Sequence, residues 1–209
     1  MRDATEGKAA ADPGVHIASP LDLAKELCDG AVDPLVVAIL QHDTKKVNTV
    51  IRAMGNFEAQ VNRRMKNGEN ALQLTLRARY SAILPSLRRA KANVENCDNS
   101  GATALITQAR VNGDLFALLC LWQAAVNAMD HRGYTALHYA VELNNKDSVL
   151  NLVTQGADVH LRSKKQGSLS AYSMAQTKDT QAALYLVLFV TQSSHRYTPR
   201  RGRHPLLPL

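Results

Sequence analysis

Residues 133–140 read Gly-Tyr-Thr-Ala-Leu-His-Tyr-Ala, and this stretch decides how the rest of the chain is interpreted. Related phrases begin at Gly68 (GENALQL) and Gly101 (GATALIT), and a looser one begins at Gly167 (GSLSAYSMA). With the third glycine at position 133, the successive intervals are 33, 32 and 34 residues. Self-similarity at a fixed period of this size indicates a chain built from stacked structural repeats.

A second phrase recurs in phase with the first. KANVEN begins at residue 91, AAVNA at 124 and GADVHL at 156, each of them 23 residues after the glycine at 68, 101 or 133. Because both phrases keep one offset in three successive units, the repeat has a constant internal layout.

The helical content of a unit follows from spacing and capping residues. Between Thr135 and Asn144 the apolar residues are Leu137, Ala140, Val141 and Leu143, a spacing that predicts one buried helix face. The Thr135 hydroxyl can accept a hydrogen bond from the free N–H groups of the first turn, so we expect it to be the N-cap. Asn70 and Ser170 stand at the same place in their units and can serve the same purpose.

A second short helix follows in the same unit. Val149, Leu152 and Val153 again mark one apolar face. Gly156 follows as a natural residue for the left-handed conformation at a helix end. Each unit is thus predicted to be a helix, a turn, a second helix and a polar loop, and neighbouring units must stack to bury their apolar faces.

These residues carry a resemblance to the ankyrin-repeat family, whose period is about 33 and whose hallmark is T-P-L-H-x-A. Residues 135–140 match four of its five specified positions, with Ala136 in place of the proline. Asp130 and Gly133 stand where the family's hairpin carries D-x-x-G. The resemblance implies an all-α ankyrin-repeat solenoid of about five helix-turn-helix units, with degenerate terminal repeats.

The same resemblance sets the expected domain organisation. Ser19 with Asp22 three residues later predicts a capped helix that covers the first repeat. The expected segments are a disordered N-terminal segment (1–18), a repeat domain (19–191) and a basic flexible tail (192–209). Within the repeat domain we expect a capping helix at 19–32 and repeats at about 33–62, 63–96, 97–128, 129–160 and 161–191.

The family's structural positions transfer residue by residue. The resemblance implies that His138 is structural and bonds between neighbouring hairpins. The positions implied to hold the repeat together are Gly68, Leu72, Gly101, Thr103, Leu105, Gly133, Thr135, Leu137, His138, Ala140 and Gly156.

Composition and motifs exclude several functional classes. The chain has 209 residues, of which 45% are hydrophobic and 21% charged, as expected of a globular protein. The apolar run 182–190 is far shorter than the ~20 residues of a membrane span. The sequence contains no G-x-S-x-G, no phosphate-binding glycine loop and no H-E-x-x-H, so we expect no catalytic, cofactor-binding or metal-binding residues. Cys97 and Cys120 are expected to face the core or an interface between repeats.

The expected binding surface is the concave face of the solenoid, where hairpin tips meet the first helix of each unit. Tip residues and the last turn of that helix are the candidates for contact with a partner protein. They are Lys66, Asn67, Glu69, Arg77, Asn99, Ser100, Arg110, His131, Arg132, Tyr134 and Glu142.

The charge pattern supports an alternative. The net charge is +7, and residues 63–91 and 160–209 each carry eight basic and one acidic side chain. A basic C-terminal tail can bind nucleic acid or an acidic partner, although Tyr197 alone is no stacking platform. The cluster at 63–91 need not form one patch, because Arg77 and Arg79 cannot face the same way on one helix.

The sequence therefore favours a non-enzymatic protein–protein interaction module. One version is a cytosolic adaptor or regulator, and the other is a small pathogen or viral protein that captures a host factor. The expected location is the cytoplasm or nucleus, or the host cytosol for a pathogen protein. An enzyme with an unrecognised active site is the third hypothesis, and it would require a deep pocket with perturbed titratable groups.

Overall fold

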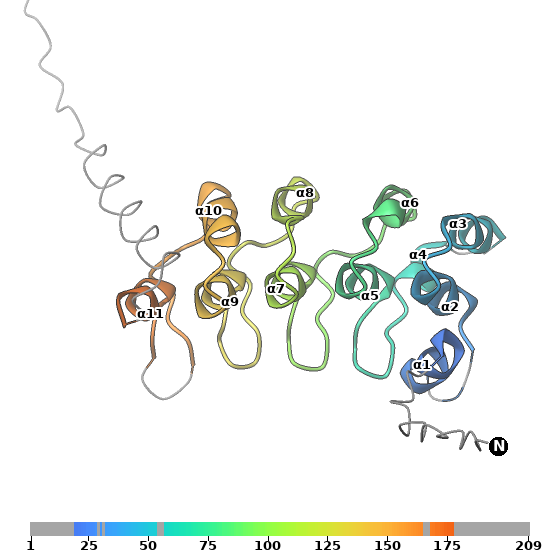
Figure 1. Cartoon of the computed structure of the whole chain (residues 1–209), viewed down its shortest axis with the longest axis horizontal. Helices are drawn as coiled ribbons and strands as arrows, with labels where there is room; N and C mark the ends of the chain where they lie inside the picture. The colour runs from blue at the N-terminus through green and yellow to red at the C-terminus, as the bar shows by residue number, and fades with distance from the viewer. Residues whose placement is uncertain (1–18, 29, 31, 54–56, 165–167, 178–209) are drawn as a thin grey trace, which may run out of the picture.

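The protein is described by a computed structural model that covers residues 19–28, 30, 32–53, 57–164 and 168–177. The segments expected to be disordered or basic at the two ends lie outside these residues, as does the apolar run 182–190. Within the described part, helices are arranged in two layers, with hairpin loops that project from one of them (Figure 1). The prediction of an all-α ankyrin solenoid is confirmed.

The helices occur in consecutive pairs, and the bounds of each pair follow the repeat. After α1 (Pro20–Leu27), an inner helix that carries the hairpins alternates with an outer helix. The pairs are α2 (Pro34–Leu40) with α3 (Thr44–Ala53), α5 (Ala71–Arg77) with α6 (Leu84–Arg89), α7 (Ala104–Arg110) with α8 (Phe116–Leu121), and α9 (Ala136–Glu142) with α10 (Lys146–Thr154), followed by the inner helix α11 (Ala171–Thr177).

Side-chain caps begin the inner helices where the sequence placed them. The Asn70 side chain accepts a hydrogen bond from the Gln73 N–H at 3.0 Å, and Thr135 accepts one from the His138 N–H at 3.5 Å. The Ser170 hydroxyl accepts from the Ser173 N–H at 3.1 Å. Each bond satisfies an N–H group that has no partner within its helix, so the predicted caps are confirmed.

Residues in the left-handed conformation end the inner helices at equivalent places. Arg79, Asn112 and Asn144 each have φ of 54°. This backbone turn sends the chain back towards the outer helix. It also corrects the expectation that Arg79 shares a helix with Arg77, because α5 ends at Arg77 and Arg79 lies beyond it.

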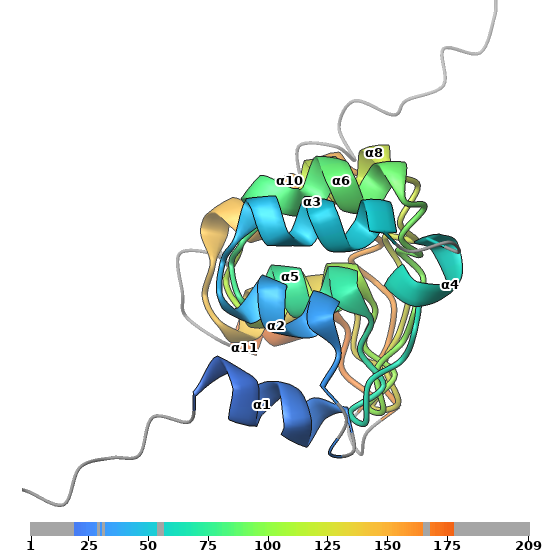
Figure 2. The same cartoon turned by 90° about the vertical axis from the view of Figure 1, so that its right-hand side faces the viewer.

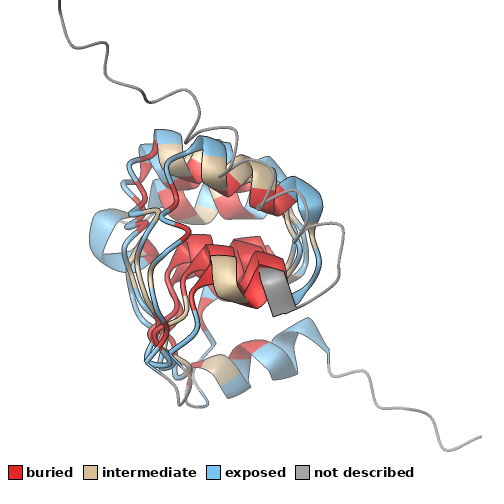
Figure 3. Cartoon of the chain, turned by 90° about the vertical axis from the view of Figure 1, so that its left-hand side faces the viewer, coloured by how far each residue is buried: buried red, intermediate tan, exposed pale blue. Residues whose placement is uncertain are grey.

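The core is a continuous apolar layer between successive units. Leu72, Leu105 and Leu137 occupy the same position in three units and are at most 1% exposed. Burial is concentrated along the inner helices, whereas the outer helices are buried only on the side that faces them (Figure 3).

The N-terminal end of the stack departs from the regular pattern. Helix α1 packs on α2 (Figure 2) and buries Ala24, while Leu21 and Leu23 stay largely exposed. The short helix α4 (Phe57–Val61) follows α3 within the first repeat, where the repeat pattern predicts no further helix. A 3₁₀ turn, η1 (Ser81–Ile83), precedes α6 and places Pro85 in the first turn of that helix, where a proline is tolerated.

Candidate protein-binding surface

Backbone hydrogen bonds join the hairpin tips into a row that crosses the repeats. The Asn99 N–H donates to the Asn67 carbonyl at 2.9 Å, and the His131 N–H donates to the Ser100 carbonyl at 2.9 Å. The same bond links the Lys164 N–H to the Arg132 carbonyl at 3.1 Å. At the N-terminal end, Lys66 donates to Leu27 of α1 at 2.8 Å, so α1 takes the place of a preceding hairpin.

The carboxylates of two hairpins are used to close their own turns. One Asp98 oxygen accepts from the N–H groups of Ser100 and Ala102, both at 2.8 Å. Asp130 accepts in the same way from Arg132 and Tyr134, both at 2.9 Å. These bonds hold the tips in one conformation. They also turn the acidic groups inward, away from the solvent side of the row.

A charged network ties the hairpins to the inner helices around Arg110. Its guanidinium donates to Asp130 at 3.0 Å and to the Tyr139 hydroxyl at 2.8 Å, and it lies 3.7 Å from Asp98. The Tyr139 hydroxyl donates to Asp130 at 2.6 Å. The Arg110 guanidinium also lies over the Tyr139 ring, 4.7 Å from its centre.

This network changes the titration of its members. Burial alone would lower the pKa of Arg110, but Tyr139 and the carboxylates of Asp98 and Asp130 raise it above the ordinary value. Burial and the hydrogen bond to Asp130 raise the pKa of Tyr139. Arg110 therefore stays charged and Tyr139 stays protonated at neutral pH, so the network presents a fixed pattern of donors.

Aromatic rings gather beside this network on the same side. Tyr134 stacks on His138 with ring centres 5.2 Å apart and meets the edge of Tyr139 at 5.5 Å. The guanidinium of Arg132 lies 4.8 Å from the centre of the Tyr134 ring. Aromatic rings that carry a polar group at one edge are typical of the residues that contribute most of the binding energy at protein interfaces.

His138 lies beneath this surface and holds two units together. Its Nδ1 bonds to Thr135 in its own unit, and its Nε2 lies 3.3 Å from the Leu169 carbonyl of the next hairpin. Burial lowers the pKa of His138, an effect that the bond to Leu169 and the charge of Asp130 only partly oppose. This arrangement matches the structural role that the resemblance implies for the residue.

Glu69 requires a correction among the predicted contact residues. It was expected to be open to a partner at a hairpin tip, yet it is buried and pairs with Arg77 of the same unit at 2.9 Å. The inward-facing carboxylate is paired with the Arg77 guanidinium, which itself stays half exposed. Glu69 thus orients Arg77 instead of facing solvent.

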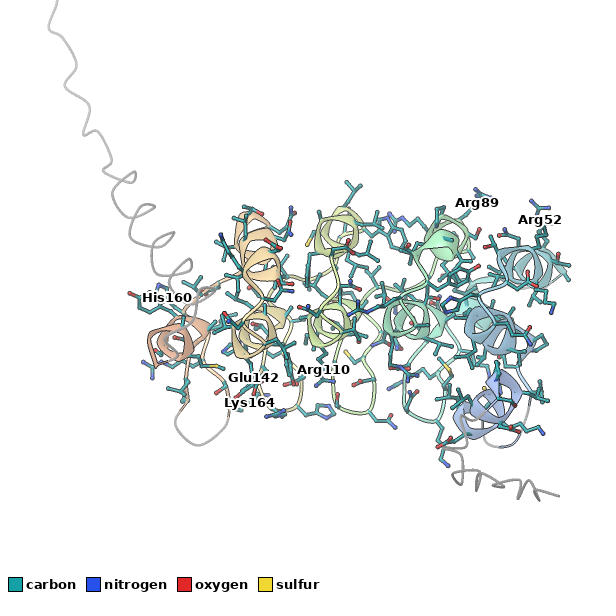
Figure 4. All side chains as sticks on the ribbon, viewed as in Figure 1. Arg52, Arg89, Arg110, Glu142, His160 and Lys164 are labelled. Atoms are coloured by element: carbon teal, nitrogen blue, oxygen red, sulfur yellow. The ribbon has the colours of Figure 1, made fainter. Side chains whose placement is uncertain are left out.

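The structure brings most of the other predicted residues to one side of the stack. We call this side the inner surface, made of the hairpin-tip row and the last turns of the inner helices. Figure 4 labels Arg110, Glu142 and Lys164 on this side, away from Arg52 and Arg89. Asn67, Arg110 and Tyr134 are partly buried, and the exposed members are Lys66, Arg77, Asn99, Ser100, His131, Arg132 and Glu142.

Four residues that were not among the predicted contact residues complete this surface. Asp98, Asp130 and Tyr139 hold Arg110, and Lys164 extends the tip row. The two aspartates lie 32 residues apart, so the period of the repeat could have identified them as equivalent positions. Tyr139 could not be recognised, because nothing in its local pattern shows that its hydroxyl reaches a hairpin.

The described residues lack two features that would indicate another function. They contain no group of three or more His, Cys, Asp or Glu side chains placed to hold a metal ion, and no helix long and apolar enough to cross a membrane. Cys97 is exposed, against the expectation that it faces the core or an interface between repeats, because it lies in the loop that leads into a hairpin. Cys120 is partly buried against the core.

Comparison with known proteins agrees with the architecture. Residues 76–163 match the family model described as ankyrin repeats in three copies. The human SH3 and multiple ankyrin repeat domains protein 2 is 31% identical over 128 residues, which cover 60% of this chain and 7% of that protein. Residues 76–163 are thus ankyrin repeats, as the sequence predicted.

Viral proteins are also among the relatives. The ankyrin repeat protein OPG189 of variola virus is 31% identical over 87 residues, which cover 41% of this chain and 16% of that protein. The putative ankyrin repeat protein FPV034 of fowlpox virus is 30% identical over 131 residues, covering 61% and 29%. The chain spans less than a third of each of these three relatives. Ankyrin repeats are in general non-enzymatic protein–protein interaction modules.

Proposed function

We propose that this protein binds a partner protein through the inner surface, and that it does so without catalysing a reaction. The observation that carries the proposal is the network of Arg110, Asp130 and Tyr139, which fixes a cation and two aromatic rings beside the tip row. Because these groups are held by bonds within the chain, little conformational entropy is lost when a partner docks on them.

The charge of the tip row indicates what the partner brings. The exposed described tips are basic or neutral (Lys66, Asn99, Ser100, Arg132, Lys164), whereas Asp98 and Asp130 point into their turns. An acidic or hydrogen-bond-accepting strip of the partner complements such a row. Tyr134 supplies the apolar contact at its centre.

Two biological settings fit this function. The relatives include a human multidomain protein and poxvirus proteins. The first supports an adaptor or regulator in the cytoplasm or nucleus, and the second supports capture of a host factor in the host cytosol. The pathogen version gains some support from the two viral relatives.

Site-specific crosslinking tests the proposal. A photoreactive amino acid at Arg132 or Ser100 should capture one protein in cells, and the same group at Leu121 on the outer helix α8 should not. The captured protein is then purified, and its affinity is measured by calorimetry. Capture at Leu121 alone would move the site to the outer helices and contradict the proposal.

Charge reversal provides the quantitative check. Arg132→Glu with Lys164→Glu should weaken binding of that protein at least about tenfold, through repulsion of its acidic strip. Lys45→Glu with Lys146→Glu changes the net charge equally on the outer helices and should leave the affinity within about twofold. An equal loss in both variants would mean that only the overall charge matters.

The basic C-terminal tail remains the second candidate. Removing residues 192–209 should leave binding to the inner surface intact. If truncation abolishes capture while the charge reversals do not, the tail is the binding element. A steep fall of affinity with salt would then identify nucleic acid as its ligand.

A further inference from the structure

The outer helices differ sharply in charge along the stack. Helices α3 and α6 carry no acidic residue, and their five basic residues are Lys45, Lys46, Arg52, Arg88 and Arg89. Helix α8 carries no charged residue, and α10 carries one of each sign. Positive charge thus gathers at the N-terminal end of the outer layer, on the side away from the inner surface (Figure 4).

A groove of about 200 Å³ lies between these two basic helices. Asn48 of α3 and Ser86 of α6 meet across it through a side-chain hydrogen bond of 2.6 Å. Ile51 and Ala90, both less than 10% exposed, contribute an apolar lining. The groove is large enough for one aliphatic side chain.

Two arginines flank the groove and have no partner among the described residues. Arg52 and Arg89 both line it and are exposed, and neither side chain forms an ion pair or hydrogen bond within the described part of the chain. Other arginines are engaged: Arg77 pairs with Glu69, and Arg88 lies over the Trp122 ring at 5.4 Å.

The acidic groups near the groove are paired with other cations and do not neutralise its positive charge. On α3, Lys46 pairs with Asp43 at 3.6 Å. On the far side, Glu58 of α4 pairs with Lys91 at 3.5 Å, so its charge is matched by a cation of its own. The positively charged guanidinium groups of Arg52 and Arg89 therefore face solvent beside the apolar side chains of the groove.

We infer that this groove is a second docking site, which binds an acidic peptide segment of a partner with an aliphatic side chain between its carboxylates. Arg52 and Arg89 each present a planar fork that matches a carboxylate through two parallel hydrogen bonds. The aliphatic side chain enters the groove and covers Ile51. Charge complementarity selects this occupant, and the site is independent of the inner surface and of the function proposed for it.

The test uses a fluorescein-labelled peptide, Asp-Glu-Leu-Glu-Glu, and the full chain. Its binding is followed by fluorescence anisotropy at low ionic strength, because screening weakens exposed charge pairs. The variant Arg52→Gln with Arg89→Gln should lower the affinity at least about tenfold. Lys46→Gln with Arg88→Gln removes the same charge from the same two helices and should change the affinity less than about twofold.

Two further probes examine the groove and the class of ligand. Replacing the leucine of the peptide by glycine should weaken binding about tenfold, and amide resonances of Ile51 and Ala90 should shift only with the leucine peptide. Equal loss in the two charge variants, or no effect of leucine, would overturn the proposal. Binding of anionic lipid vesicles or inorganic phosphate without binding of the peptide would overturn it as well.

Discussion

The inner and outer helices of the same repeats contrast in how their residues are used. In α5, α7 and α9, six of seven residues are buried, whereas α6 and α8 bury two of six and α10 buries three of nine. Helices α5, α7 and α9 lie between inner helices on both sides, with an outer helix above and a hairpin below (Figure 1). The buried residues of the inner layer therefore stabilise the fold. Most residues of the outer layer are not buried, so they determine the charge and the contacts of the surface.

The sharpest test of this contrast places a charge in each layer. Leu137→Asp puts a carboxylate in the inner core, where the side chain is 1% exposed, and should lower the free energy of unfolding by at least about 4 kcal/mol. Leu121→Asp on α8, at 76% exposure, should stay within about 0.5 kcal/mol. Urea unfolding measures both, and a near wild-type transition for Leu137→Asp would refute the register.

Removing a carboxylate from each layer should give the next largest difference. Asp130→Ala leaves the Tyr139 hydroxyl and two hairpin N–H groups without an acceptor and removes one of the two carboxylates beside Arg110, at a cost of about 3 kcal/mol. Asp147→Ala on α10 loses only a favourable charge in the first helical turn, about 0.5 kcal/mol. A larger loss of thermal stability in Asp147→Ala than in Asp130→Ala would contradict the contrast between the two layers.

Two glycines have similar backbone angles but different surroundings, so alanine substitutions at them distinguish the effect of close packing from that of backbone strain. Gly101 has φ of +81°, and an added Cβ would lie 2.6 Å from the His131 ring and 2.8 Å from its backbone nitrogen. Gly156 has φ of +89° and open space around it. Gly101→Ala should therefore cost about 2 kcal/mol and Gly156→Ala about 1 kcal/mol. Equal costs in chemical denaturation would show that the hairpin yields to the methyl group.

The smallest expected effect is a pH dependence that originates in the inner layer. Burial lowers the pKa of His138 in the folded state, so as pH falls the unfolded chain takes up the proton first, near pH 6.5. The contribution to stability is complete above about pH 6.5 and is lost as pH falls towards the folded pKa. Urea unfolding between about pH 7.5 and about pH 5.5 should show this decline.

Two histidine variants assign this decline to one residue. His138→Gln should remove the pH-dependent part, whereas His131→Gln, at an exposed tip, should keep it. A decline that persists unchanged in His138→Gln would place its origin elsewhere in the chain.

The regular part of the fold could be predicted because its determinants are local. The caps at Asn70 and Thr135 and the apolar spacing after them act within one helical turn, and they recur with the period of the chain. The short helix α4 was not predicted, since the residues there follow no repeat. The second helix of the last unit, expected before residue 191, lies outside the described residues.

The candidate site was predicted less completely because its contacts cross repeats. Periodicity identified Arg110 and Arg132 as surface candidates, but it treated Glu69 in the same way, although that side chain turns inward onto Arg77. Nor did spacing show that Arg110 reaches Asp130, twenty positions along the chain, or that Tyr139 joins them. Such pairings depend on side-chain reach and on the stacking of units.

By itself, the sequence determined the class of fold, the period and the positions that must be buried, because capping and apolar spacing are local properties that repeat along the chain. The tertiary structure decided which charges are free. It turned Glu69 and Asp130 inward, where low solvent exposure makes pairing favourable. It left Arg52 and Arg89 beside one groove without a described partner, although these two residues lie 37 positions apart in the sequence.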